Sequence, residues 1–279
     1  MSTHSLGRVP VRLTGVPETM LWPLYNRTAE ARRPDARLRD PEAVRIADAI
    51  DYDYSRSFGK PDYVHALRAL TFDRLLRDWA DRRPGGSVVA LGEGLETQVK
   101  RVDDGRVRWL SVDLPEAIEV RRRFLPDDDR HRNFACSALD FRWMDEVDPA
   151  APVFVTAAGL LMYFRPELVC GLVAAIAERL PAAEVAFDVI PRWLSRKSLR
   201  GWRVTPHYTA PPMPWGLNRN EAAGLRAWHP NIGEVRVVDY FGGRGAFGLL
   251  ARLARVTPGL RHHVPLILHL TCRPAGAAQ

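Results

Sequence analysis

A short glycine turn followed by a carboxylate is the first feature of this chain that could do chemistry. The apolar run Val88 to Leu91 stops at Gly92-Glu93-Gly94, and a second apolar run ends in Asp113. This order predicts a strand, a glycine turn, a helix and a second strand that ends in a carboxylate. In nucleotide-binding α/β units the glycines let the backbone approach a ligand, and the carboxylate accepts hydrogen bonds from ribose hydroxyls. Alone the pattern is weak, because any tight turn between a strand and a helix can use Gly-x-Gly.

A second carboxylate, Asp140, follows the third apolar run. The carboxyl ends of parallel strands meet at one edge of a sheet, where ligands bind. One carboxylate suits a ribose and the other suits the exocyclic amine of an adenine, so the pair favours S-adenosylmethionine over a dinucleotide. A nicotinamide oxidoreductase would also need a third glycine where Thr97 stands. Helix capping is the alternative role for both aspartates.

The surrounding elements predict an α/β protein with a doubly wound parallel sheet. Helical spacing dominates residues 17–81, and the Arg-Arg-Pro-Gly-Gly break at residues 82–86 leads into the first strand. Apolar runs then alternate with amphipathic segments, as in a Rossmann-like sheet. We expect an N-terminal helical cap over residues 1–84 and a Rossmann-like domain over residues 85–279. The first five predicted strands are residues 88–91, 107–112, 133–138, 153–157 and 185–190.

Residues 191–230 interrupt this alternation and are rich in Trp, Pro and Arg. We interpret them as a lid inserted between the late strands, lying over the sheet. Strand-like patterns return at residues 235–241 and 266–271, with a helix-like pattern at residues 246–254 between them. A helix followed by a closing strand is compatible with an antiparallel last pair.

Composition limits the classes of partner. The formal net charge is +7, but the basic residues are mostly scattered arginines, with no basic block interleaved with aromatics, so we expect no nucleic-acid binding. Three cysteines lie far apart and His262-His263 has no neighbouring ligand pattern, so we expect neither a disulfide framework nor a metal site. No signal peptide is present, and no run approaches the ~20 apolar residues of a membrane span. These features predict a soluble, cytoplasmic protein that does not bind membranes.

A set of motifs along almost the whole chain resembles the leucine carboxyl methyltransferase family. Within the family the similarity is to the bacterial branch of tetracenomycin-type polyketide O-methyltransferases. The glycine turn followed by Leu-Glu-Thr and the run Gly-Leu-Leu-Met-Tyr are specific to this family. The residues that carry the resemblance are Arg32-Arg33-Pro34-Asp35, Asp40-Pro41, Arg68, residues 91–97, residues 112–115, Asp140, residues 159–164 and Pro214-Trp215-Gly216-Leu217.

The resemblance implies a class I methyltransferase with S-adenosylmethionine as its cofactor. It assigns Arg68 to the methionine carboxylate of the cofactor, Asp113 to the ribose and Asp140 to the adenine edge. An arginine of the amino-terminal segment, Arg32 or Arg33, is expected to fold over the cofactor. The expected cofactor-binding residues are Arg33, Arg68, Gly92, Glu93, Gly94, Asp113, Leu114, Asp140, Phe141 and Ala158.

Two positions depart from the family pattern. A glutamate usually precedes Gly-Leu-Leu-Met-Tyr, near the amino group of the cofactor, whereas this chain has Ala158. The glycine turn usually has a small residue at its centre, whereas this chain has Glu93. We hypothesise that Glu93 supplies the carboxylate that Ala158 lacks. The alternative is a non-catalytic homologue that binds the cofactor weakly or not at all.

The expected reaction is O-methylation of a small secondary metabolite such as a polyketide, on a carboxylate or a hydroxyl. A carboxylate, with a pKa of ~4, is already ionised at neutral pH and needs no general base, whereas a phenol needs one. We therefore expect no catalytic side chain. A carboxyl methyltransferase that acts on a protein C-terminus is a further alternative, and the oligomeric state stays open. The candidates to line the acceptor pocket are Tyr163, Arg192, Trp193, Arg203, His207, Tyr208 and Trp215.

Overall fold

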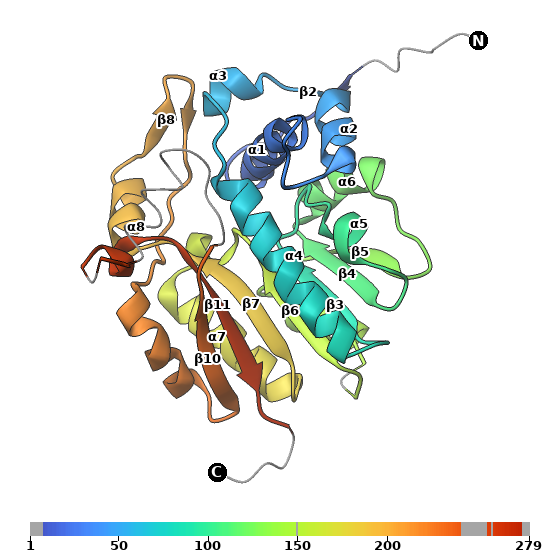
Figure 1. Cartoon of the computed structure of the whole chain (residues 1–279), viewed down its shortest axis with the longest axis vertical. Helices are drawn as coiled ribbons and strands as arrows, with labels where there is room; N and C mark the ends of the chain where they lie inside the picture. Colours follow the sequence, from blue (N-terminus) through green and yellow to red (C-terminus); the bar gives the residue numbers. More distant parts are fainter. Residues whose placement is uncertain (1–7, 149, 241–255, 258, 275–279) are drawn as a thin grey trace.

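A seven-stranded sheet forms the centre of the protein in the computed structural model, which describes residues 8–148, 150–240, 256–257 and 259–274 (Figure 1). Its strands are β3 (Ser87–Leu91), β4 (Arg108–Asp113), β5 (His131–Ala135), β6 (Val153–Ala157), β7 (Glu184–Val189), β10 (Ile232–Val238) and β11 (Leu266–Cys272). They lie in the order β10-β11-β7-β6-β3-β4-β5. Strands β3 to β7 pair in parallel, whereas β11 runs antiparallel to both β7 and β10. The predicted doubly wound sheet and its antiparallel last pair are both confirmed.

Helices cover both faces of this sheet. They are α4 (Val64–Arg82) and α5 (Gln98–Val102) on one face, and α7 (Pro166–Arg179) with the 3-10 helices η2 (Phe141–Glu146) and η4 (Arg219–Trp228) on the other. Successive side chains of a strand point to opposite faces. In β3, Val88 packs in the same cluster as Trp79 of α4, whereas Val89 packs with Ile176 of α7. Both layers are therefore built from the same short apolar runs.

The N-terminal segment packs in two different places. Its elements are the 3-10 helix η1 (Pro17–Met20), α1 (Leu21–Ala31), α2 (Pro41–Ala49), α3 (Tyr54–Phe58) and the short strand pair β1 (Val9–Pro10) and β2 (Ile50–Asp51). Leu24, Ile46 and Phe58 from α1, α2 and α3 form one apolar cluster with Phe124 of α6 (Pro115–Phe124). The next helix, α4, lies directly on the sheet. Asp40 begins α2, because its carboxylate accepts a hydrogen bond from the N–H of Ala43 at 3.0 Å, ahead of a proline in the first turn.

The segment after β7 leaves the sheet. It contains α8 (Arg192–Leu199) and the hairpin of β8 (Arg203–Thr205) and β9 (Tyr208–Thr209) before the chain returns through η4. Tyr208 and Ala210 pack in the same apolar cluster as α1 and α3. Figure 1 shows this segment and the N-terminal helices at the same end of the molecule. The helix expected at residues 246–254 lies outside the described residues.

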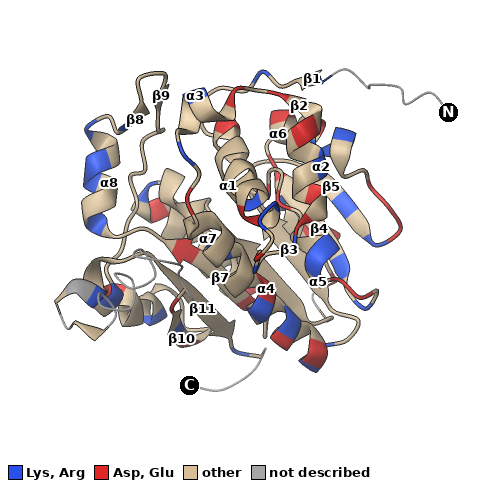
Figure 2. Ribbon diagram, turned by 45° about the horizontal axis from the view of Figure 1, so that its top comes forward, with Lys and Arg blue, Asp and Glu red and all other residues tan. Residues whose placement is uncertain are grey.

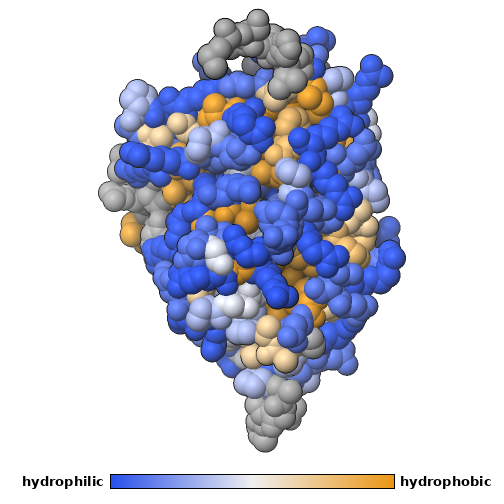
Figure 3. Space-filling model, turned by 90° about the vertical axis from the view of Figure 1, so that its right-hand side faces the viewer, coloured by the Kyte–Doolittle hydropathy of each residue, from blue (hydrophilic) through white to orange (hydrophobic). Residues whose placement is uncertain are grey.

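Several predicted strand limits shift by two or three residues. The sequence suggested residues 133–138 for the third strand, whereas β5 pairs with β4 from His131 opposite Trp109 to Ala135 opposite Asp113. The strand β5 therefore ends where its partner β4 ends. The hydrophobicity of the residues in β5 alone could not predict this limit. Among the described helices none is long and apolar enough to cross a bilayer. The face of the molecule on the β5 side is mostly hydrophilic with separated hydrophobic patches (Figure 3).

Candidate active site

A cavity of about 570 Å³ lies at the carboxyl ends of the parallel strands. Gly92 after β3, Asp113 at the end of β4 and Gly159 after β6 line it. It is placed where the strand order reverses, between β3 and β6, which is where open parallel sheets bind ligands. Trp22 of α1 and Trp202 of the insertion line its other side. The cavity therefore lies between the sheet and the two segments that cover its end.

The glycine turn is held by Asp113. The carboxylate of Asp113 accepts hydrogen bonds from the N–H groups of Gly94 and Leu114, each at 2.7 Å. Gly92 and Gly94 have positive φ values of 61° and 51°, a region that favours glycine. A Cβ at Gly94 would also lie 2.6 Å from the Cβ of Met20. Burial raises the pKa of Asp113, and the two N–H groups oppose that rise.

Arg68 and Asp188 form an ion pair in the cavity. The Nη1 atom of Arg68 lies 3.1 Å from Oδ2 of Asp188, while the other oxygen accepts the N–H of Gly159 at 2.5 Å. Burial opposes the charge on Arg68, but Asp188, together with Tyr240 and Glu96, outweighs it and raises the pKa of the guanidinium. A Cβ at Gly159 would lie 2.6 Å from the same Nη1 atom, so a side chain there would displace the guanidinium from its place beside Asp188. Sequence reasoning missed Asp188, although a single aspartate near the end of an apolar strand was a readable signal.

Asp188 is a second candidate for the carboxylate that Ala158 lacks. The Oε2 atom of Glu93 lies 3.0 Å from Arg121 and accepts the indole N–H of Trp109 at 3.2 Å. The Glu93 side chain is 3% exposed and lines the cavity, so its contact with the cofactor stays a prediction. Ala158 lines the cavity, and the carboxylate bonded to the next residue, Gly159, is that of Asp188.

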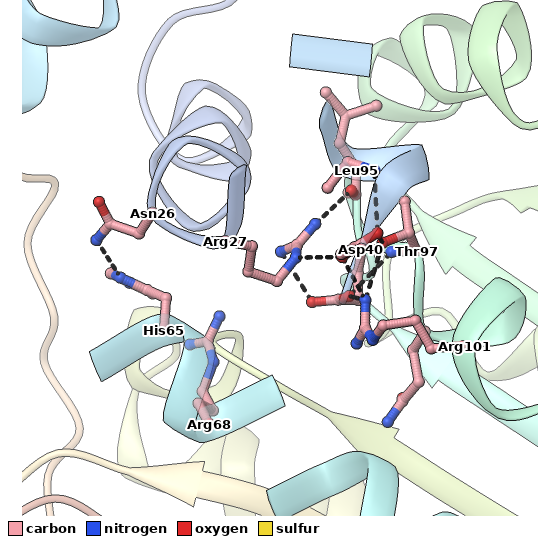
Figure 4. Close-up of polar contacts among 12 residues, drawn as sticks. Asn26, Arg27, Asp40, His65, Arg68, Leu95, Thr97 and Arg101 are labelled. Atoms are coloured by element: carbon pink, nitrogen blue, oxygen red, sulfur yellow. Dashed lines mark hydrogen bonds and ion pairs between the residues drawn. The ribbon is translucent and has the colours of Figure 1, made fainter. Parts of the chain in front are cut away.

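A buried network of charges fixes the loop after the glycine turn (Figure 4). Arg27 of α1 binds Asp40 at 3.3 Å, Glu96 at 2.9 Å and the carbonyl of Leu95 at 2.8 Å. Arg101 of α5 binds Asp40 at 2.7 Å and Glu96 at 2.8 Å. Burial alone would raise the pKa of Glu96, but Arg27 and Arg101 lower it to about 2. The N-terminal helices are therefore attached to the loop that shapes the cavity.

The expectation that Arg33 covers the cofactor is wrong for this structure. The Arg33 side chain is 52% exposed, pairs with Asp35 at 3.0 Å and does not line the cavity. Arg27, six residues earlier, lines it instead and is buried. The sequence could not separate these arginines, because only the packing of α1 decides which of them points inward.

The predicted adenine contacts are also displaced. Asp140 accepts the backbone N–H of Arg142 at 3.3 Å and pairs with the side chain of Arg142 at 2.5 Å. It thus begins η2 as a helix cap, which was the alternative role considered for it. Neither Asp140 nor Phe141 lines the cavity, and Ser137 and Ala138 lie there in their place.

Aromatic side chains form the wall opposite the sheet. Tyr163 and Tyr208 line the cavity as predicted, and Trp193 lies there with them. Trp22, which the sequence did not single out, has its ring centre 5.9 Å from that of Trp202 and 6.1 Å from that of Tyr208. These rings come from segments about 180 residues apart, so no local pattern could have predicted the cluster.

The other predicted acceptor contacts lie elsewhere. Arg192 pairs with Glu221 at 2.8 Å on the surface, and His207 is exposed in the turn between β8 and β9. Trp215 is buried in the core, with its ring centre 6.0 Å from that of Phe187. Arg203 lines a neighbouring groove instead of the cavity. Each of these assignments is a correction, because packing places the four side chains on the surface, in the core or in the neighbouring groove instead of in the cavity.

The groups in the cavity fit S-adenosylmethionine by their chemistry. Arg68 has N–H groups to offer a carboxylate, and Asp188 can accept from an ammonium group. Each oxygen of Asp113 keeps an acceptor position beyond its one backbone bond, which suits two adjacent ribose hydroxyls. Leu114 and Ala138 give an apolar surface beside it. Within the described residues no group of three His, Cys, Asp or Glu side chains could hold a metal ion.

Comparisons with known sequences identify the family of the chain. The model of the family described as leucine carboxyl methyltransferase matches residues 21–177. The tetracenomycin polyketide synthesis O-methyltransferase TcmP of Streptomyces glaucescens is 34% identical over 253 residues, which cover 84% of this chain and 92% of that protein. The S-adenosyl-L-methionine-dependent methyltransferase dpfgK of Gibberella zeae is 26% identical over 211 residues, which cover 67% of this chain and 70% of that protein.

Solved structures share the fold at low sequence identity. The plantazolicin methyltransferase BamL superposes with a TM-score of 0.52 and 11% identity, covering 92% of this chain and 97% of that one. The CurJ carbon methyltransferase gives a TM-score of 0.51 and 10% identity, covering 92% and 69% of the two chains. These likenesses establish the class I methyltransferase fold. With the family match, they show that the chain belongs to the leucine carboxyl methyltransferase family and is an S-adenosylmethionine-dependent methyltransferase.

Proposed function

We propose that the protein transfers the methyl group of S-adenosylmethionine to a carboxylate oxygen of a flat, largely aromatic small-molecule acid. The O-methyltransferase activity in the name of TcmP supports an oxygen acceptor. The wall of Trp22, Trp202 and Tyr208 supports a flat apolar acceptor, because aromatic faces bind ring systems by stacking and edge contacts. The choice of a carboxylate over a hydroxyl rests on one side chain, His65.

The proton of His65 is placed by its neighbours. Its Nδ1 atom lies 2.7 Å from the amide nitrogen of Asn26 (Figure 4). The amide is oriented by the N–H of Asp62, which donates to Oδ1 of Asn26 at 3.4 Å. An amide nitrogen can only donate, so Nδ1 accepts and the ring proton is on Nε2. The carboxylate of Asp62 is 3.6 Å from Nδ1, too far for a hydrogen bond.

This arrangement makes His65 a donor and not a base. Burial lowers the pKa of His65, Arg68 and Arg27 lower it further, and Asp62 opposes both effects. A neutral imidazole with its proton on Nε2 cannot take a second proton at that atom, but it can donate a hydrogen bond. His65 lines the cavity between Arg68, one turn along α4, and Trp22, whose ring centre is 5.8 Å away. We infer that Nε2 orients one oxygen of the acceptor carboxylate.

Methyl transfer to a carboxylate depends on how the acceptor and the cofactor are positioned, and not on proton transfer by a side chain. The cofactor supplies an electrophilic methyl group on a sulfonium. Arg68 would hold its carboxylate end and Asp113 its ribose, while His65 would orient the acceptor carboxylate toward the methyl group. Methyl transfer requires the reacting atoms ~3 Å apart and aligned. Because a carboxylate acceptor is already ionised, no side chain would need to take a proton.

A matched pair of acceptors tests this function. With labelled S-adenosylmethionine, the protein should methylate 2-naphthoic acid and leave 2-naphthol unmodified. His65→Ala should raise the KM for the acid about tenfold, the value of one hydrogen bond to a charged group, with unchanged affinity for S-adenosylhomocysteine. His65→Gln, which keeps an N–H donor, should recover most of that loss. Preferred methylation of the naphthol, with a rate that rises between pH 6 and 8, would assign His65 as a base and overturn the proposal.

A further inference from the structure

A second hollow, a groove of about 480 Å³, adjoins the cavity. Trp193, Lys197 and Trp202 line both, so the groove continues the aromatic wall toward the outside. Its other side chains are Arg196, Arg200 and Arg203. Arg203, which was predicted to contact the acceptor in the cavity, therefore lies in the adjoining groove. The sequence expectation of no basic segment with interleaved aromatics is wrong for residues 192–203.

The cations of this groove have no acidic partner. Arg196, Lys197, Arg200 and Arg203 are exposed, and no carboxylate in the described part of the chain pairs with them. Other arginines nearby behave differently, since Arg192 pairs with Glu221 and Arg219 pairs with Asp239. Figure 2 shows blue segments along α8. Unpaired like charges this close repel one another, so a bound anion would stabilise them.

Two indole rings in the groove are fixed in place. The Nε1 atom of Trp193 donates to the carbonyl of His263 at 2.8 Å, although the side chain is 49% exposed. The ammonium of Lys197 lies 4.7 Å from the ring centre of Trp202, within the range of a cation–π contact. An exposed aromatic face held rigid beside unpaired cations suits a ligand with both a flat apolar part and a negative charge.

We propose that this groove is a binding site for a second anionic group of the methyl acceptor, a carboxylate, sulfate or phosphate on the part that extends out of the cavity. The inference rests on the proposed function, since it takes the cavity as the acceptor site. Continuity with the cavity favours a small molecule that occupies both hollows. Cations at such a rim attract the ligand and fix its direction, so the end that is methylated enters first.

Direct binding tests the groove without requiring methyl transfer. The probes are pyranine, a pyrene with three sulfonates, and pyrene-1-sulfonate, each titrated into the protein saturated with S-adenosylhomocysteine and followed by fluorescence anisotropy. Arg196→Gln with Arg200→Gln should weaken pyranine binding at least tenfold and pyrene-1-sulfonate binding less than threefold. The control, Arg123→Gln with Arg132→Gln, removes the same charge on α6 and β5 and should change neither.

Three outcomes would overturn the proposal. They are equal pyranine affinity in the wild type and the groove variant, equal losses for both probes, and a loss of affinity for anionic phospholipid vesicles alone, which would make α8 a membrane-binding helix. Absence of methyl transfer to 2-naphthoic acid would contradict the proposed function and leave the pyranine result standing. The two failures are therefore distinguishable.

Discussion

The two halves of the cavity differ in how their charges are arranged. On the sheet side, Arg68 is paired with Asp188, Glu93 with Arg121 and Glu96 with Arg27 and Arg101. On the insertion side, Lys197 and its neighbours are exposed without carboxylate partners among the described residues. Paired, buried charges hold a geometry suited to one fixed ligand, and the cofactor is such a ligand. Exposed charges without a carboxylate partner hold no such fixed geometry, which suits a ligand that is bound less rigidly.

Unpairing a charge on the sheet side should have the largest effect. Arg101 is 5% exposed and pairs with Asp40, Asp73 and Glu96, so Arg101→Met would leave Asp73 without its cation and Asp40 and Glu96 with Arg27 alone. We expect a loss of about 3–5 kcal/mol in the free energy of unfolding, measured by urea denaturation.

The control for that change is Arg74→Met. Its side chain is 59% exposed and lies 3.9 Å from Asp78, so its removal should change stability by less than about 1 kcal/mol. Similar losses in the two variants would remove the contrast between buried and exposed pairs.

Lowering the pH should destabilise the sheet side of the cavity at a higher pH than it affects the insertion. His131 is buried and bonded to Ser111, and burial, together with Arg121, lowers its pKa to about 4. The unfolded chain thus binds this proton first, so stability is complete above about pH 6.5 and falls toward pH 4 by up to about 3 kcal/mol.

Glu96 extends this loss to lower pH. Its pKa is about 2, so its contribution is present above the unfolded value near 4.3 and falls below that pH. Thermal melting between pH 7 and 4 measures the His131 part together with that of His65, whose pKa burial also lowers. His131→Gln should make the profile shallower, whereas His207→Gln, at an exposed position of the insertion, should leave it as in the wild type. A wild-type melting temperature that does not change from pH 7 to 4 would contradict the assignment.

Cofactor affinity gives the next contrast. Arg68→Ala removes the only guanidinium that we assign to the methionine carboxylate, so the Kd for S-adenosylhomocysteine should rise about 100-fold, or about 2.7 kcal/mol. Calorimetry measures it. Arg68→Lys keeps the charge beside Asp188 and should lose less, which separates binding from the stability of the buried pair. An unchanged Kd in Arg68→Ala would remove this residue from the cofactor site.

The smallest expected difference between the two halves of the cavity is in how salt affects ligand binding. Exposed cations act over a Debye length of about 10 Å at 0.1 M salt, while buried pairs are screened much less. Raising NaCl from 0.05 to 0.5 M, on the order of a tenfold change, should lower kcat/KM for an anionic acceptor a few-fold. The Kd for S-adenosylhomocysteine should change less than twofold. The reverse pattern would place the working cations on the sheet side.

The sequence could predict features that depend on neighbouring residues, and it could not predict contacts between distant segments. The strand ends, the glycine turn and Asp113 are local patterns, because each residue acts next to its own element. Asp140 kept its position but not its expected role, since a capped 3-10 turn and an adenine contact share the same local sequence. Asp188 lies at a strand end like Asp113 and was readable in the same way, whereas His65 and Trp22 enter the cavity through packing between distant segments. A single chain carries no signal for such packing beyond the residue types themselves.

The dependence of methyl transfer on pH tests the central claim most directly. Single-turnover rates would be measured with 2-naphthoic acid between pH 5.5 and 8, with the cofactor saturating. An acceptor that is already ionised and oriented by a neutral His65 predicts a flat profile across this range. A rate that rises tenfold per pH unit would show that a proton must leave before methyl transfer, and would contradict a carboxylate acceptor held without a base.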